Sequence, residues 1–169
     1  MLVTAHHEAY IQKKEVLYMP NGLHEMELEV PIEKIWAFVS DMDKWAPLVP
    51  GYIEHEVLSE SQSTWKFKGD IGIMQKTVSL GIDITEWREP TKVTFDLKGL
   101  NENFDGNGYF EAEAISENKT KMTGYLDITA KGMMGPMINA ILKNFVPKTA
   151  HELTDAIGNK IVEVETVRS

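Results

Sequence analysis

The five histidines are the side chains of this sequence best suited to chemistry near neutral pH. In YIEHEV (52–57), His55 alternates with Ile53 and Val57, so all three share one face of the expected strand. If that face is buried, the imidazole can hydrogen-bond a ligand or act as a general acid or base. The pattern fits equally a core histidine whose ring nitrogens are satisfied by neighbours, or a strand whose facing is shifted by one residue.

Other motifs for catalysis or cofactor binding are weak. His6 and His7 are adjacent, so their rings diverge, and a helical Glu-x-x-His pattern is lacking. GDIGIM (69–74) falls within expected strands, whereas a dinucleotide fingerprint opens a helix. DGNG (105–108) favours a turn or bulge near the rim of a pocket. Since the chain also has no cysteine for thiolate chemistry, we expect no metal, no cofactor and no catalytic residue.

The composition indicates an ordinary globular chain. It has 169 residues, 43% of them hydrophobic and 25% charged, which fits a single domain with a sizeable core or pocket. A net charge of −9 argues against nucleic acid and anionic lipid as partners. No stretch approaches the roughly 18–20 apolar residues of a membrane span, and no secretory signal is recognised. We expect a cytoplasmic protein without a stable membrane anchor.

Period-two alternation predicts a series of antiparallel strands. The first covers 23–30, and after Pro31 a helical pattern and a second short helical turn follow. Further strands are expected at 51–60, 63–74, 77–87, 92–99, 103–115 and 121–132, and a long helix that Pro147 kinks or splits ends the chain. The fold class is therefore α+β, with six to seven strands curved around one long helix. Residues 1–21 form an extension of unknown structure, and 22–169 form the domain.

This architecture predicts a pocket. A helix of about 10–12 Å diameter cannot fill a curved sheet whose strands add about 4.8 Å each, so space remains between helix and sheet. Bulky or polar side chains on the inward faces are the candidate ligand-binding residues. These are His55, Trp65, Phe67, Ile73, Leu80, Ile82, Phe95, Leu97, Tyr109, Phe110, Met122, Leu126, Met134, Met137, Ile138, Ile141 and Phe145.

The segment KGMMGPM (131–137) predicts how the long helix begins. Gly132 and Gly135 allow a sharp turn off the last strand, and Pro136 suits a first helical turn. Met133, Met134 and Met137 then fall where the helix crosses the open end of the sheet. Because methionine adapts to varied partners, we interpret these three residues as a deformable rim of the pocket.

Three stretches of the sequence resemble the START-like, Bet v 1-like (SRPBCC) superfamily, over residues 22 to about 160. They are EVPIEKIWAFVSDMDKWAPLVPG, GDIGIMQKTVSLGIDITEWREPTKVTFDLKG and DITAKGMMGPM. Within the superfamily, the chain looks most similar to the CoxG-like family of carbon monoxide dehydrogenase proteins. The resemblance implies the helix-grip fold with a hydrophobic cavity. It also implies an accessory role beside a molybdenum-containing dehydrogenase as partner, with a link to the membrane or its quinones. The membrane-seeking tail of longer relatives is missing from this sequence.

Three classes of function follow from these patterns. The leading hypothesis is a non-enzymatic carrier that binds a lipophilic small molecule, such as a lipid or quinone, with His55 or Tyr109 as polar anchor. The second is an enzyme of the polyketide cyclase or dehydratase type, which requires a titratable group in the same cavity. The third is a protein-interaction module that docks through the start of the long helix.

Overall fold

The computed structural model describes residues 21–71 and 74–168, so residues 1–20, with His6 and His7, and the candidate Ile73 lie outside the described residues. In the described part, seven antiparallel strands form one sheet in the order β1-β7-β6-β5-β4-β3-β2. The strands are β1 (Asn21–Leu28), β2 (Tyr52–Val57), β3 (Gln62–Ile71), β4 (Met74–Arg88), β5 (Lys92–Gly99), β6 (Phe104–Ser116) and β7 (Lys119–Ala130). This confirms the predicted helix-grip α+β fold.

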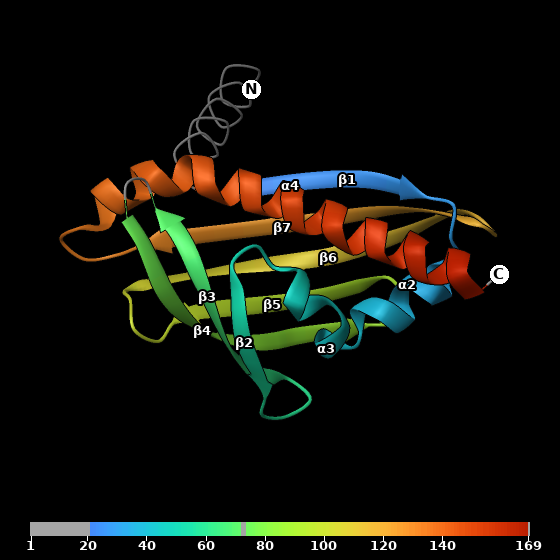
Figure 1. The fold of residues 1–169 in the computed structure, drawn as a ribbon, viewed down its shortest axis with the longest axis horizontal. Helices are drawn as coiled ribbons and strands as arrows, with labels where there is room; N and C mark the ends of the chain where they lie inside the picture. The colour runs from blue at the N-terminus through green and yellow to red at the C-terminus, as the bar shows by residue number, and fades with distance from the viewer. Residues whose placement is uncertain (1–20, 72–73, 169) are drawn as a thin grey trace, which may run out of the picture.

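Helices cover one face of this sheet. The short helices α2 (Ile32–Val39) and α3 (Met42–Trp45) and the 3₁₀ turn η1 (Ala46–Leu48) connect β1 to β2, and α4 (Gly135–Arg168) ends the chain. Figure 1 shows α4 running along the sheet beside β1 and β7, with α2 near its C-terminal end. The Asp41 side chain caps α3 by accepting from the backbone N–H of Asp43 at 3.1 Å.

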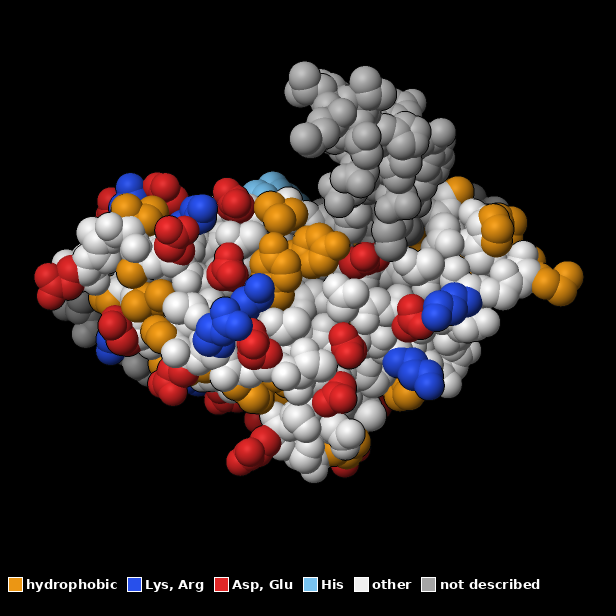
Figure 2. All heavy atoms as spheres, turned by 180° about the vertical axis from the view of Figure 1, so that it is seen from behind, with side chains coloured by type: hydrophobic (Ala, Val, Ile, Leu, Met, Phe, Trp, Pro, Cys, Tyr) orange, Lys and Arg blue, Asp and Glu red, His pale blue; other side chains and the backbone are white. Residues whose placement is uncertain are grey.

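Side-chain alternation decides which face of each strand is buried. On β1, Leu28 is buried while Glu25 and Glu27 are exposed, as the sequence predicted. The face turned away from α4, seen in Figure 2, carries many acidic and basic side chains, with hydrophobic ones in several places among them. The apolar core therefore lies between the inner face of the sheet and the helices.

One local expectation was wrong, and a second was wrong in part. DGNG forms no turn, because residues 105–108 lie inside β6 and pair with both β5 and β7. A side chain at Gly106 would collide with the Asp127 backbone, which explains why glycine suits this paired position. Pro147 does not split α4, which continues from Gly135 to Arg168. Proline removes one helical hydrogen bond, but Val146 and Ala150 on either side are buried and hold both flanks in place.

Candidate functional site

A cavity of about 500 Å³ lies between the first half of α4 and the sheet. Its walls are mainly apolar side chains from β3, β4, β6, β7 and α4, together with the β5–β6 and β7–α4 connections. The apolar lining residues are Phe67, Val78, Phe104, Ile128, Ala130, Met133, Met134, Met137, Ile138, Ile141, Leu142 and Phe145. The predicted pocket between helix and sheet is therefore present, and its volume falls in the range of about 300–1,000 Å³ typical of small-molecule sites.

Three methionines surround the mouth of this cavity. Met133 is fully exposed, and Met134 and Met137 are 55% and 56% exposed, although all three also line the cavity. Gly132 adopts a positive φ of 82°, which turns the chain from β7 toward α4 as expected for glycine. These three methionines, called here the methionine rim, have the position predicted from the sequence, because none is packed in the core.

One side chain fixes the start of α4 against the sheet. Asn139 accepts a hydrogen bond from the Ala130 backbone N–H at 2.7 Å and donates one to the Ala130 carbonyl at 3.0 Å. Ala130 is the last residue of β7, so this pair of hydrogen bonds sets the height of the first helical turns above the strand. The wall of the cavity carried by α4 is thereby held in place next to the adaptable side chains of the methionine rim.

The polar groups of the cavity lie at its edge. Lys76 and Glu102 line it and form an ion pair with each other, with side chains 45% and 27% exposed. Lys131 also lines it, and its ammonium group lies 2.6 Å from the Asp105 carboxylate. The Lys131 backbone N–H donates to the Asn103 carbonyl at 2.9 Å, which joins the two connections that form the mouth. The charges are therefore paired, and the interior of the cavity stays apolar.

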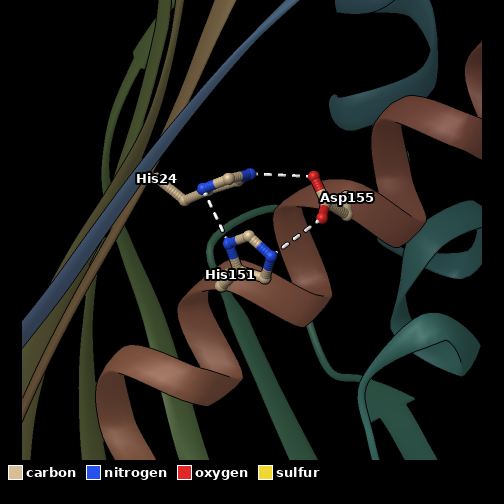
Figure 3. A group of neighbouring side chains, drawn as sticks. All are labelled: His24, His151 and Asp155. Carbon is tan, nitrogen blue, oxygen red and sulfur yellow. Dashed lines mark hydrogen bonds and ion pairs between the residues drawn. The ribbon is translucent and has the colours of Figure 1, made fainter.

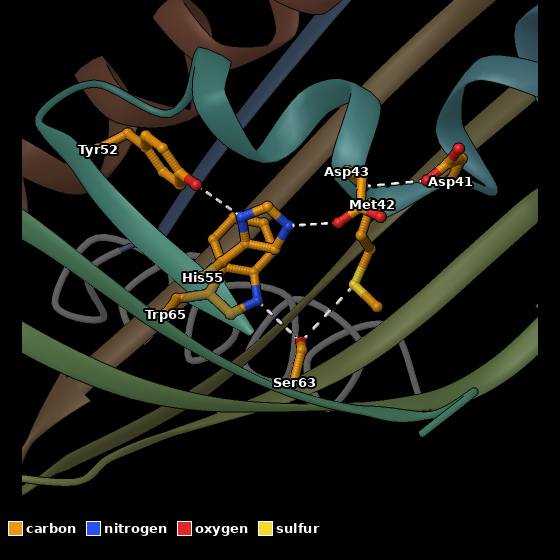
Figure 4. A network of polar contacts seen from close by, with 7 residues as sticks. All are labelled: Asp41, Met42, Asp43, Tyr52, His55, Ser63 and Trp65. Atoms are coloured by element: carbon orange, nitrogen blue, oxygen red, sulfur yellow. Dashed lines mark hydrogen bonds and ion pairs between the residues drawn. The ribbon is translucent and has the colours of Figure 1, made fainter. Parts of the chain in front are cut away.

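His55 is satisfied by its neighbours and does not line this cavity. Its Nε2 lies 2.6 Å from Oδ1 of Asp43 on α3, and its Nδ1 lies 2.6 Å from the Tyr52 hydroxyl (Figure 4). The ring also packs against Trp65, whose indole N–H donates to the Ser63 hydroxyl at 2.8 Å. Both ring nitrogens are used, so the arrangement matches the alternative of a locally satisfied histidine. His55 and Trp65 line a separate hollow of about 490 Å³ beside β2, whose other lining residues include Glu54, Glu56 and Lys66.

A second, much smaller void of about 70 Å³ lies beneath the following part of α4. The candidates Phe95, Tyr109, Phe110 and Leu126 border it. The Tyr109 ring, however, stacks on Tyr125 with centroids 5.1 Å apart, and the Lys92 ammonium lies 4.5 Å from its centroid. Burial, and then the charges of Glu111 and Glu25, raise the pKa of the Tyr109 hydroxyl. Because those glutamates are exposed, Tyr109 belongs to the solvent-facing side of the sheet and is no anchor for the large cavity.

The structure thus divides the seventeen candidate residues. Phe67, Met134, Met137, Ile138, Ile141 and Phe145 line the large cavity. Leu80, Ile82, Leu97 and Met122 are buried in the core and border none of the three cavities described here. The candidate list missed Phe104, Ile128 and Leu142, which also line the cavity. The alternation of the strands at 103–115 and 121–132 and the helical period after residue 133 place these three side chains on inward faces. The list also missed the Lys76–Glu102 pair, which joins β4 to the β5–β6 connection.

Comparison with known proteins places this fold. A protein-family model matches residues 19–167, nearly the whole domain. The fold is similar to a START superfamily protein from Mycobacterium smegmatis (TM-score 0.65, 16% identity, covering 85% of this chain and 98% of that one). It is also similar to the ZhuI aromatase/cyclase from Streptomyces sp. R1128 (TM-score 0.65, 13% identity, covering 83% of this chain and 92% of that one).

A third similar structure is a norcoclaurine synthase from Thalictrum flavum, solved as a point mutant with a transition-state analogue (TM-score 0.61, 13% identity, covering 86% of this chain and 95% of that one). The sequence has no significant match among curated proteins. None of the described helices is long and apolar enough to cross a membrane.

Proposed function

We propose that this chain, whose fold is similar to those of a START superfamily protein and an aromatase/cyclase, binds a lipophilic small molecule in the cavity under the first half of α4. The observation that carries this proposal is the lining itself. Phe67, Ile141 and Phe145 offer large apolar surfaces, and the charged side chains at the edge are paired with each other. Each Å² of ligand surface buried there contributes about 25 cal/mol, so apolar rings and chains are favoured over polar ligands.

The role we propose is that of a carrier rather than a catalyst. Exposed Met133 beside half-exposed Met134 and Met137 gives the mouth side chains that can change conformation as a ligand enters or leaves. The resemblance to the CoxG-like family suggests the setting, an accessory protein that delivers a lipid or quinone to a molybdenum-containing dehydrogenase. The methionine rim is then the surface that meets the partner enzyme during transfer.

Mass spectrometry of the full chain tests this proposal. Protein purified under native conditions should carry a lipophilic molecule that organic extraction releases. After extraction, a short-chain quinone or palmitate should raise the melting temperature in proportion to the logarithm of its concentration. A chain that shows no bound molecule, and no thermal shift with quinones, fatty acids or aromatic polyketides, would contradict the proposal.

A second candidate function is cyclase-type catalysis in the same cavity, favoured by the position of Glu102. This carboxylate lines the cavity beside Lys76 and is only 27% exposed on its side chain, so it can exchange a proton with a bound polyketide chain. Glu102→Gln should then abolish turnover of an aromatic polyketide substrate while the ligand still binds. Glu113→Gln, on the exposed Glu113–Lys121 pair, is the matched control. Equal rates with Glu102→Gln and wild type would exclude Glu102 from catalysis.

A further inference from the structure

Two histidines and an aspartate converge outside the cavity, where β1 crosses α4. His24 Nε2 lies 2.8 Å from Asp155 Oδ1, and His151 Nε2 lies 3.1 Å from Asp155 Oδ2. The two rings face each other through their Nδ1 atoms at 2.9 Å, so the three side chains form a closed triangle (Figure 3). This His–His–Asp cluster (His24, His151 and Asp155) joins residues more than a hundred positions apart in the chain.

The three side chains of this cluster turn their lone-pair atoms toward one another. Each imidazole has a ring nitrogen that can act as a metal ligand, and the carboxylate offers two oxygens. A divalent cation placed among them would accept a lone pair from each ring and from the carboxylate.

The donor set and its spacing fit a transition metal. Imidazole nitrogen with carboxylate oxygen suits Zn²⁺, Co²⁺ or Ni²⁺ rather than Mg²⁺ or Ca²⁺. One donor atom from each residue lies within 4.8 Å of the others, and a tetrahedral zinc holds such donors roughly 3.3–3.5 Å apart. His151 and Asp155 are separated by one helical turn on α4, so they present their donors from the same face.

The backbones around the cluster are held close together by glycines. A side chain at Gly22 of β1 would lie 2.5 Å from Pro147 Cα, and one at Gly124 of β7 would collide with Thr154. Gly158 lies about one turn after the cluster on α4, and the space that a side chain there would need is occupied by the Met26 side chain. His24 lies between these contacts, on β1 opposite Gly124. The distance between β1 and α4 is therefore fixed by backbone packing, which preorganises the three donors.

We propose that His24, His151 and Asp155 form a binding site for a divalent transition-metal cation such as Zn²⁺, which cross-links β1 to α4. With three protein ligands, the fourth position is left for water, since His151 and Asp155 are 57% and 38% exposed on their side chains. The metal would hold α4 on the sheet immediately after the segment that covers the cavity. This inference does not depend on the identity of the ligand bound in the cavity.

Metal titration of the full chain tests the proposal. After treatment with EDTA and dialysis, calorimetry with ZnCl₂ should show one saturable site, and CoCl₂ should give the visible absorption of a low-symmetry cobalt centre. ZnCl₂ should also raise the melting temperature. His151→Gln and Asp155→Asn should each weaken zinc binding about tenfold or more and remove the thermal shift. Both residues are partly exposed, so these variants should fold even if His24→Gln does not.

Two control variants separate this site from adventitious binding. The double variant His6→Gln/His7→Gln removes the two histidines that are adjacent in the sequence. Glu152→Gln changes the exposed carboxylate that follows His151 in the chain. Both should leave zinc affinity within about twofold of wild type, well inside the tenfold loss expected for a ligand. Absence of saturable binding in the wild-type chain would overturn the proposal. So would loss of binding in His6→Gln/His7→Gln with binding unchanged in His151→Gln.

Discussion

The two halves of α4 cover the sheet in different ways. The open half (residues 135–146) lies over a cavity of about 500 Å³, whereas the packed half (residues 147–161) leaves only about 70 Å³ beneath it. In the packed half, Ile157 and Ile161 are buried together with Ile35 and Phe38 of α2. In the open half, Ile138 and Ile141 are only half-buried. One helix therefore serves as core at one end and as pocket wall at the other.

Glycine and a second helix explain this difference. Gly22, Gly124 and Gly158 allow the packed half to lie directly on β1 and β7, and α2 fills what space remains beside it. The open half begins with the methionine rim and is held to β7 by Asn139, whose side chain spaces the helix from the strand end. The cavity is thus a consequence of which residues lie at the contact, and substitutions in each half should behave differently.

Truncation of a buried side chain should show the largest difference between the halves. Ile161 is 1% exposed in the packed half, so Ile161→Ala should lower the free energy of unfolding by about 2–5 kcal/mol. Met137→Ala, at a rim residue of the open half, should change it by about 0.5 kcal/mol or less. Urea denaturation measures both. Similar losses for the two variants would mean that the open half is packed as tightly as the other.

Replacing an isoleucine by phenylalanine should lower stability in the packed half and weaken ligand binding in the open half. Ile157→Phe overfills a packed site and should cost about 1–3 kcal/mol. Ile141→Phe places its extra atoms in the cavity, so it should leave the free energy of unfolding nearly unchanged. Because the ligand loses part of its space, the affinity for a quinone or fatty acid should fall about tenfold or more. Thermal denaturation and ligand titration of each variant provide the check. Equal loss of stability would contradict the comparison.

Removal of the contact that fixes the open half should have an intermediate effect. Asn139→Ala deletes both hydrogen bonds to Ala130 and should cost about 1–2 kcal/mol. It should also increase amide hydrogen exchange at the start of α4, because the helix is no longer tied to β7. Asn144→Ala, at an exposed position of the same helix, is the matched control. Unchanged exchange in Asn139→Ala would show that the rim itself positions the helix.

A change on the other face of the sheet should have the smallest effect and leave both halves intact. Burial raises the pKa of Asp127 above its ordinary value of 3.8, the hydrogen bond from Tyr125 opposes that rise, and Asp105 adds to it. The folded state therefore holds this proton more tightly than the unfolded state, so stability falls as pH rises from 3.8 through the folded pKa. Asp127→Asn should slightly raise the melting temperature at neutral pH, and the gain should vanish below pH 3.8. A constant difference at every pH would point to another cause.

The elements of this fold follow from local patterns, and the cavity follows from them. Alternation on β1 placed Leu28 inward and Glu27 outward, and the same rule found Phe67 at the cavity wall. Gly132 and the methionine rim could be placed because backbone freedom and the helix start are local properties. Such features depend on a few neighbouring residues, which is why the sequence alone was sufficient to predict them.

The features that the sequence did not predict depend on contacts between distant segments. His55 has the inward pattern of a ligand anchor, yet Asp43 of α3 reaches its Nε2 and satisfies it. The Lys76–Glu102 pair likewise joins β4 to the β5–β6 connection, and the His–His–Asp cluster joins β1 to α4. The sequence shows only that His151 and Asp155 lie four residues apart, and their partner His24 is brought to them by the pairing of β1 with β7.

The most direct test of ligand binding under the open half of α4 is native mass spectrometry of wild type beside Ile141→Phe and Ile157→Phe, each extracted and then loaded with the same short-chain quinone. We expect a one-to-one complex with wild type and with any folded Ile157→Phe protein, and a much weaker complex with Ile141→Phe. That result would assign binding to the large cavity. Equal occupancy in Ile141→Phe and wild type, or no complex with wild type across quinones and fatty acids, would contradict it.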